Sequence, residues 1–155
     1  MFESTLATTE DAQLILKLYE LRTEATMRQA RTWLVTEFFP TKAEEAVNIL
    51  CAIGTQENAW LRQVTSYWDM AAAFVTHGAL NAELFLDCNM EPFFLYAKFE
   101  PFLKEIRAAR PSFLTKLQNL IDEYPEARGR VDQMVRTMPE RAAAAAHARH
   151  SGAKP

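Results

Sequence analysis

Apolar residues recur at spacings of three and four along most of the chain, and no segment alternates apolar and polar residues over a useful length. Spacings of three and four place side chains on one face of an α-helix, whereas strict alternation would indicate a β-strand. The pattern therefore predicts an all-α protein, folded as a single-domain bundle of about seven helices.

Capping residues and breaks divide the first half of the chain into helices. Thr8 or Thr9 is the expected N-cap of the first helix, and a break near Arg22–Thr23 separates it from a second helix that continues to Pro40. The segment Thr41-Lys-Ala-Glu44 fits a capping box, which predicts a short helix that Gly54 stops.

Proline and asparagine set the boundaries in the second half. Asn81 is expected to cap a short helix over residues 82–88, and Pro92 to start a longer one that Pro101 kinks. Pro125 suits the first position of a further helix, which Pro139 should interrupt. We expect residues 1–139 to form the helical domain and residues 140–155 an alanine-rich helical extension with a disordered tail.

The helix predicted over residues 56–77 is the most informative element. At about 100° per residue, apolar side chains cover about two-thirds of its circumference. An arc this wide indicates a helix packed on several sides, as at the centre of a bundle. The polar side chains share the remaining strip: Arg62, Thr65, Ser66, Asp69, Thr76 and His77.

Two interpretations of this polar strip stay open. It is either a surface facing water or the lining of a groove between helices, with aromatic walls and a carboxylate as its charged anchor. The groove residues would be Trp60, Tyr67, Trp68 and Asp69. A buried Asp69 would need a partner, because an unpaired buried carboxylate is costly to keep ionised. The candidate partners are Arg28, Arg31 and Arg62.

Charge is distributed unevenly along the chain. Residues 1–103 carry seven Lys or Arg against fourteen Asp or Glu, whereas residues 104–155 carry ten against six. Either the two parts face each other, within one fold or across a dimer, or the basic C-terminal segment meets an anionic partner. The net charge of −3 disfavours nucleic acid as that partner, and so does the scatter of the C-terminal arginines around their helices.

Familiar catalytic and cofactor motifs are missing from the sequence. The four glycines are too dispersed for a phosphate-binding loop, and no Glu-x-x-His pair of the kind that holds metals in bundles occurs. We therefore expect no catalytic residue, cofactor or metal, which argues against an enzyme without deciding the question. Two isolated cysteines, the absence of a signal-peptide pattern at residues 1–9 and the lack of a long apolar run favour a cytoplasmic protein without a membrane segment.

Three stretches of the sequence resemble those of a known group of proteins. They are Leu18-Tyr-Glu-Leu-Arg22 with Met27-Arg-x-Ala-Arg31, Tyr67-Trp-Asp69 with the segment from Gly78 to Leu84, and Ile106-Arg107 before Pro111. Over residues 10–125 the chain resembles a loose group of uncharacterised bacterial all-helical domains of unknown function. The resemblance implies a fold but no activity.

Taken together, these observations predict a domain that acts through protein–protein contacts, with itself as a homodimer or with another protein. The alternative is a small-molecule binder or sensor that uses the aromatic interhelical pocket near Asp69.

Overall fold

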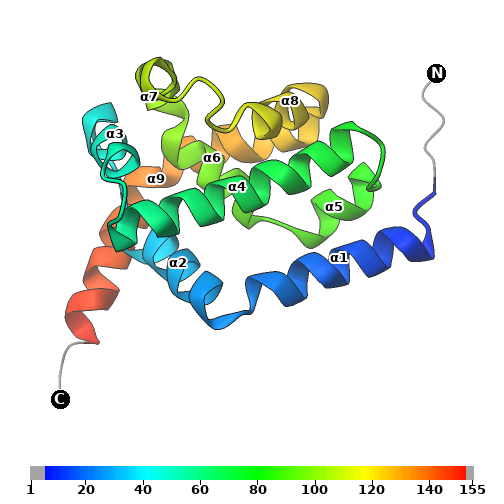
Figure 1. Ribbon diagram of the computed structural model, residues 1–155, viewed down its shortest axis with the longest axis horizontal. Coiled ribbons are helices and arrows are strands. Elements are labelled where there is room, and N and C mark those ends of the chain that lie inside the picture. Colours follow the sequence, from blue (N-terminus) through cyan, green and yellow to red (C-terminus); the bar gives the residue numbers. More distant parts are fainter. Residues whose placement is uncertain (1–5, 153–155) are drawn as a thin grey trace.

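The computed structural model of the chain describes residues 6–152. Every regular element in that range is helical and none is a strand, which confirms the predicted all-α, single-domain bundle (Figure 1). The elements are α1 (Thr9–Arg22), α2 (Ala25–Thr36), α3 (Ala43–Cys51), α4 (Gln56–Thr76), α5 (Ala82–Cys88), α6 (Glu91–Phe99), the 3₁₀-helix η1 (Glu100–Phe102), α7 (Leu103–Ala109), α8 (Thr115–Glu123) and α9 (Pro125–Ser151).

Helix α4 crosses the middle of the molecule, as the width of its apolar arc predicted (Figure 1). Thr55 caps its N-terminus, because the Thr55 hydroxyl accepts the Asn58 N–H at 3.3 Å. Helices α2, α3, α5 and α8 all pack against it. Its completely inaccessible side chains are Leu61, Val64, Trp68, Ala71 and Ala72. Helix α4 is therefore buried on several sides.

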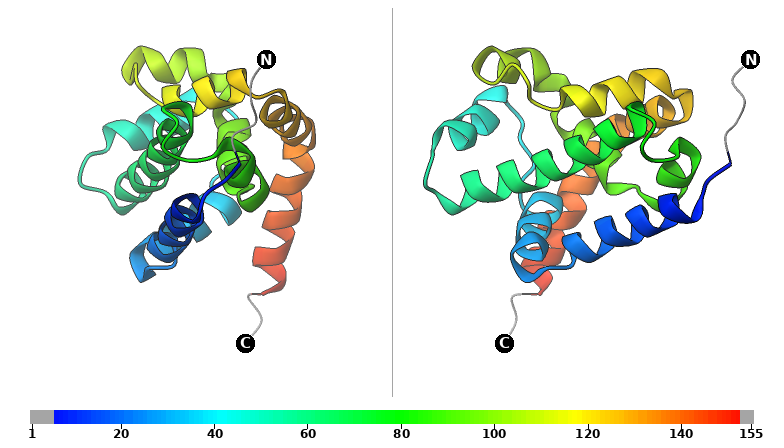
Figure 2. Two further views of the ribbon diagram at one scale, coloured as in Figure 1. Left: turned by 90° about the vertical axis from the view of Figure 1, so that its right-hand side faces the viewer. Right: turned by 45° about the vertical axis from the view of Figure 1, so that its right-hand side comes forward.

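Helix α6 is a second buried helix, which the periodicity did not single out. Seven of its nine residues are buried, and it packs mainly against α9. Phe93 and Phe99 are completely inaccessible. The left view of Figure 2 shows α9, the helix on which α6 packs, in orange and red along one side of the bundle. The core is therefore formed around two helices, α4 and α6, rather than around α4 alone.

The predicted starts and stops of several helices are confirmed. Thr8 is the N-cap of α1, forming a capping box with Asp11, and Asn81 caps α5. The chain breaks after Arg22, where α1 ends. Gly78 follows α4 with φ +77°, in the left-handed region that a residue without Cβ adopts easily.

Two predicted features of the helix boundaries are wrong. The capping box expected from Thr41 to Glu44 does not form: Lys42 is the N-cap of α3, and Thr41 instead bonds to the Glu45 carboxylate, one residue later. The kink expected at Pro101 is a full break, because the helix that begins near Pro92 divides into α6, η1 and α7.

Helix α9 continues through Pro139, which was expected to interrupt it. A proline inside a helix costs about 3 kcal/mol, so contacts beyond it must offset that loss. Two such contacts exist: the Arg141 guanidinium lies 5.7 Å from the centre of the Phe94 ring, and Arg149 donates a hydrogen bond to the Thr36 carbonyl. The disordered tail was expected after the helical extension within residues 140–155, of which residues 153–155 lie outside the described residues.

The uneven charge along the sequence is partly compensated within the fold. Arg128 of α9 forms an ion pair with Glu100 at 2.6 Å, joining the basic C-terminal segment to the acidic first part of the chain. Arg130 donates to the Leu86 carbonyl at 2.6 Å. Both contacts bring the two parts together in one molecule.

Candidate functional site: a groove beside α4

The four residues predicted to line one groove lie on different sides of α4. Asp69 and its neighbours on the polar strip face α8 and the loop before it, where they line a groove. Tyr67 and Trp68 face the opposite way, and Trp60 lies at a separate hollow. Consecutive helical residues point about 100° apart, so Tyr67, Trp68 and Asp69 cannot share one wall.

Tyr67 and Trp68 are structural residues. Trp68 is completely inaccessible, and its indole N–H donates to the Glu91 carboxylate at 3.3 Å. The Tyr67 hydroxyl donates to the Leu18 carbonyl, and the two rings meet edge to face at 4.8 Å. These contacts join α4 to α1 and α6. Burial raises the pKa of Tyr67 to about 12, which keeps its hydroxyl protonated and able to donate.

Trp60 borders a smaller hollow between α2 and α4. Its ring lies 5.9 Å from that of Trp33, with the planes tilted by 41°. The hollow measures about 410 Å³ and also includes Arg28 and Gln56. The predicted aromatic walls therefore do not surround Asp69.

The predicted ion-pair partners of Asp69 are bound elsewhere. Arg31 pairs with Glu91 at 2.6 Å, and this contact raises the pKa of the Arg31 guanidinium. Arg28 donates to the Thr23 carbonyl, and Arg62 donates to the Asn58 amide oxygen at 3.5 Å. None of the ion pairs within residues 6–152 includes Asp69. The prediction of an arginine partner is wrong.

Asp69 instead caps a neighbouring helix. Its carboxylate accepts the backbone N–H of Leu117 at 2.8 Å, in the first turn of α8. The residue at the N-cap position of α8 is Leu114, which has a left-handed backbone with φ 54° and no side chain able to cap. A helix leaves its first N–H groups without internal partners. Asp69 supplies from α4 the acceptor that the local sequence of α8 lacks.

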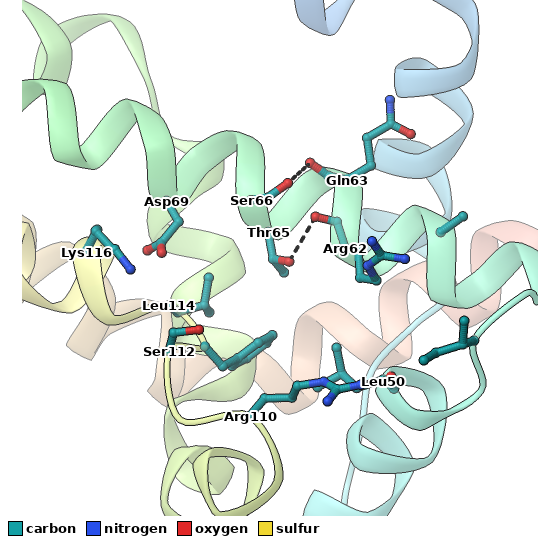
Figure 3. A pocket seen from close by; sticks show the side chains of 13 residues that line it. Leu50, Arg62, Gln63, Thr65, Ser66, Asp69, Arg110, Ser112, Leu114 and Lys116 are labelled. Carbon is teal, nitrogen blue, oxygen red and sulfur yellow. Dashed lines mark hydrogen bonds between the residues drawn. The ribbon is translucent and has the colours of Figure 1, made fainter.

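The polar strip of α4 forms one wall of a groove of about 840 Å³. Figure 3 shows Arg62, Thr65, Ser66 and Asp69 along this wall, with Arg110 across from them. The opposite side is formed by the end of α3 and by the chain from α7 into α8. Its lining residues are Leu50, Ile53, Arg110, Ser112, Phe113, Leu114 and Lys116. The groove is thus partly apolar and carries three cationic side chains.

Burial and hydrogen bonding act in opposite directions on Asp69. Partial removal from water raises the pKa of its carboxyl, whereas the Leu117 N–H and the positive charge of Lys116 act to lower it. The net direction is upward, so the fold disfavours the ionised form relative to the unfolded chain. What Asp69 contributes to the fold is an acceptor atom more than a charge.

The sequence-based reasoning missed Lys98. This side chain is only 2% exposed, and its ammonium donates to the Leu34 carbonyl near the end of α2. The ammonium nitrogen lies 4.0 Å from the centre of the Phe39 ring and 4.8 Å from that of Phe94. Burial lowers the pKa of Lys98 to about 7. The sequence did contain a signal for a buried lysine, because Lys98 is the single charge within the apolar run from Pro92 to Phe99.

Fold and site together define a small helical domain with a mixed polar and apolar groove on one side of its central helix. The chain belongs to a protein family described as a domain of unknown function, DUF4760, whose model matches residues 7–124. This confirms the expected membership of an uncharacterised group, and the matched range includes the whole groove. No curated protein and no solved structure matches the chain.

Two further observations concern the part of the chain that the structure describes. It contains no group of three or more His, Cys, Asp or Glu side chains placed to hold a metal ion. Within the same residues, none of the helices combines the length and the apolar character that crossing a membrane requires.

Replacing Asp69 by alanine should lower the free energy of unfolding by about 1 kcal/mol, because α8 loses its N-terminal acceptor. Asp69→Asn keeps an oxygen that can accept the Leu117 N–H and removes the buried charge. We therefore expect the asparagine variant to be at least as stable as the unaltered protein at pH 7. Urea unfolding measures both differences, with Asp87→Ala, at an exposed position of α5, as the control. Equal losses in both Asp69 variants would contradict the role as an acceptor.

Lys98 should make stability depend on pH above neutrality. Its pKa is about 7 in the fold and 10.5 ordinarily, so between these values the unfolded chain binds the extra proton and stability rises with pH. The slope is at most about 1.4 kcal/mol per pH unit. Lys98→Met should remove this rise in urea unfolding between pH 7 and 9.5, whereas Lys104→Met, which replaces an exposed lysine of α7, should retain it. If stability changes with pH in the same way in both variants, Lys98 is not the group that causes the rise.

Proposed function

We propose that this domain binds a small molecule in the groove beside α4. The observation that carries the proposal is a concave surface of about 840 Å³ that combines apolar walls with polar side chains aimed into it. Sites for small molecules usually measure about 300–1,000 Å³ and combine these two kinds of lining. The match of the family model over the whole groove-forming segment supports a role for the domain itself.

The groove is held open by contacts that do not need a ligand. Arg107 donates to the Phe113 carbonyl at 2.9 Å and to the Leu114 carbonyl at 3.4 Å, so it holds the chain between α7 and α8 in place. Asp69 fixes the start of α8 from the other side. A site organised before binding does not have to pay for ordering its walls when a ligand arrives.

Binding without catalysis is the better interpretation of this groove. Its described lining contains neither a histidine nor a cysteine, and the Thr65 and Ser66 hydroxyls donate to carbonyls of their own helix at 2.7 Å and 3.3 Å. A nucleophile needs a neighbouring base to activate it.

A cytoplasmic location is part of the proposal, supported by the free, exposed thiols of Cys51 and Cys88.

A screen of metabolites by thermal shift tests the proposal. A ligand of the groove should raise the melting temperature in a saturable way. Ser66→Trp, which fills the groove from α4, should abolish that rise, whereas Gln13→Trp on the exposed face of α1 should leave it unchanged. A shift that survives Ser66→Trp would place the ligand elsewhere, and a library without any saturable shift would count against the proposal.

A second proposal is that two copies associate through α1. Leu16 and Tyr19 lie one turn apart on this helix and remain 65% and 56% exposed. Neighbouring apolar side chains left open to water favour a protein contact, and a symmetric dimer is the commonest way to cover them.

Light scattering over a wide range of concentrations tests the dimer. We expect twice the mass of one chain, and Leu16→Glu should reduce it to the mass of one chain because a charge would be buried in the contact. Lys17→Glu, at the residue of α1 that follows Leu16, is the control and should leave the dimer intact. A single-chain mass at every concentration would exclude this proposal.

A further inference from the structure

The cations of the groove are not matched by carboxylates. Arg62, Arg110 and Lys116 line it, and Asp69 is the one acidic side chain among its described lining residues. The Asp69 carboxylate is already occupied by the Leu117 N–H, and Lys116 lies close enough to lower the pKa of Asp69 through its charge. Lys116 is therefore partly balanced by Asp69, and the two arginines remain.

Arg62 and Arg110 lack the carboxylate partners that three other arginines of the fold have. Arg31, Arg128 and Arg130 all pair with carboxylates at distances of 2.5–2.6 Å. Within residues 6–152, the ion pairs include neither Arg62 nor Arg110. Each guanidinium carries five N–H donors, and arginine is suited to bind carboxylate and phosphate groups with two parallel hydrogen bonds.

The position of Arg110 directs its charge into the groove. Its guanidinium donates to the Leu50 carbonyl at 3.0 Å, which holds the side chain against the end of α3. Figure 3 shows Arg62 extending from α4 and Arg110 extending from the opposite wall. An anionic group between them would receive donors from α4 and from Arg110, the residue that follows α7.

Apolar side chains lie beside the two arginines. Leu50 and Phe113 are 4% and 7% exposed and form the floor, whereas Ile53 is 76% exposed at the rim. A ligand with an apolar body would cover this surface and gain about 25 cal/mol for each Å² of apolar area removed from water. The lining therefore fits a molecule that is charged at one end and apolar at the other.

We propose that the groove binds a small amphiphilic anion, with its carboxylate or phosphate between Arg62 and Arg110 and its apolar part against Leu50, Ile53 and Phe113. The inference rests on the proposed function and adds the class of ligand. A large polyanion is disfavoured, because the chain as a whole carries a net charge of −3 and would repel it.

Isothermal titration at low ionic strength, with probes that share a six-carbon chain, tests this assignment. Hexanoate and hexyl phosphate should bind saturably, and their relative affinity identifies the preferred head group. Hexan-1-ol and hexylammonium should bind at least about tenfold more weakly, since they lack the charge that the arginines attract. Acetate and inorganic phosphate should also bind more weakly, because they lack the apolar part.

Arg62→Gln and Arg110→Gln should each weaken hexanoate or hexyl phosphate by about tenfold or more. Arg28→Gln, on the exposed face of α2, is the matched control and should have no effect. All three positions are exposed, so the variants should fold, which circular dichroism would check.

Equal affinity for hexan-1-ol, or anion binding that both groove variants retain, would overturn the assignment. A neutral or cationic ligand that Ser66→Trp blocks would overturn it while leaving the proposed function intact. If none of the six-carbon probes binds and no metabolite gives a saturable shift, both the proposed function and this assignment of the ligand are refuted. Binding of duplex DNA or an acidic peptide in place of the six-carbon anions would likewise overturn the assignment to a small molecule.

Discussion

The burial of α4 is the constraint on which the rest of the structure depends. Its apolar arc needs cover on several sides, and α2, α3, α5 and α8 provide it. The strip through Arg62, Ser66 and Asp69 remains at least partly open to water, because covering it would cost the hydration of its polar groups. The groove occupies this strip, where α3 and α8 pack against the edges of α4 without closing over it. The location of the site thus follows from the burial of the core.

Asp69 determines both the shape and the charge of this groove. By accepting the Leu117 N–H it holds the start of α8 against α4, which places Lys116 and the preceding loop along the opposite wall. The same contact uses the one carboxylate among the described lining residues, so the arginines are left without a counter-charge there. A capping interaction between two helices therefore also sets the electrostatic character of the site.

Several features could be predicted because they depend on neighbouring residues. Thr8, Thr55 and Asn81 cap the helices that follow them, and Gly78 ends α4, since each acts within one helical turn. The candidate site was predicted less well. Asp69 lies in a groove, but Tyr67 and Trp68 belong to the core, and Arg31 pairs with Glu91, which is 60 residues away in sequence. Lys98 was missed because its environment comes from α2 and the loop after it.

The sequence by itself determined the helical class, the central place of α4 and the polar strip along it, because helical periodicity records which side of a helix is buried. The tertiary structure alone decided what faces that strip. The cap that Asp69 provides to α8, the opposition of Arg62 and Arg110, and the continuation of α9 through Pro139 all join residues far apart in the chain. Local propensities act over a few residues, whereas such contacts form only when packing brings distant segments together.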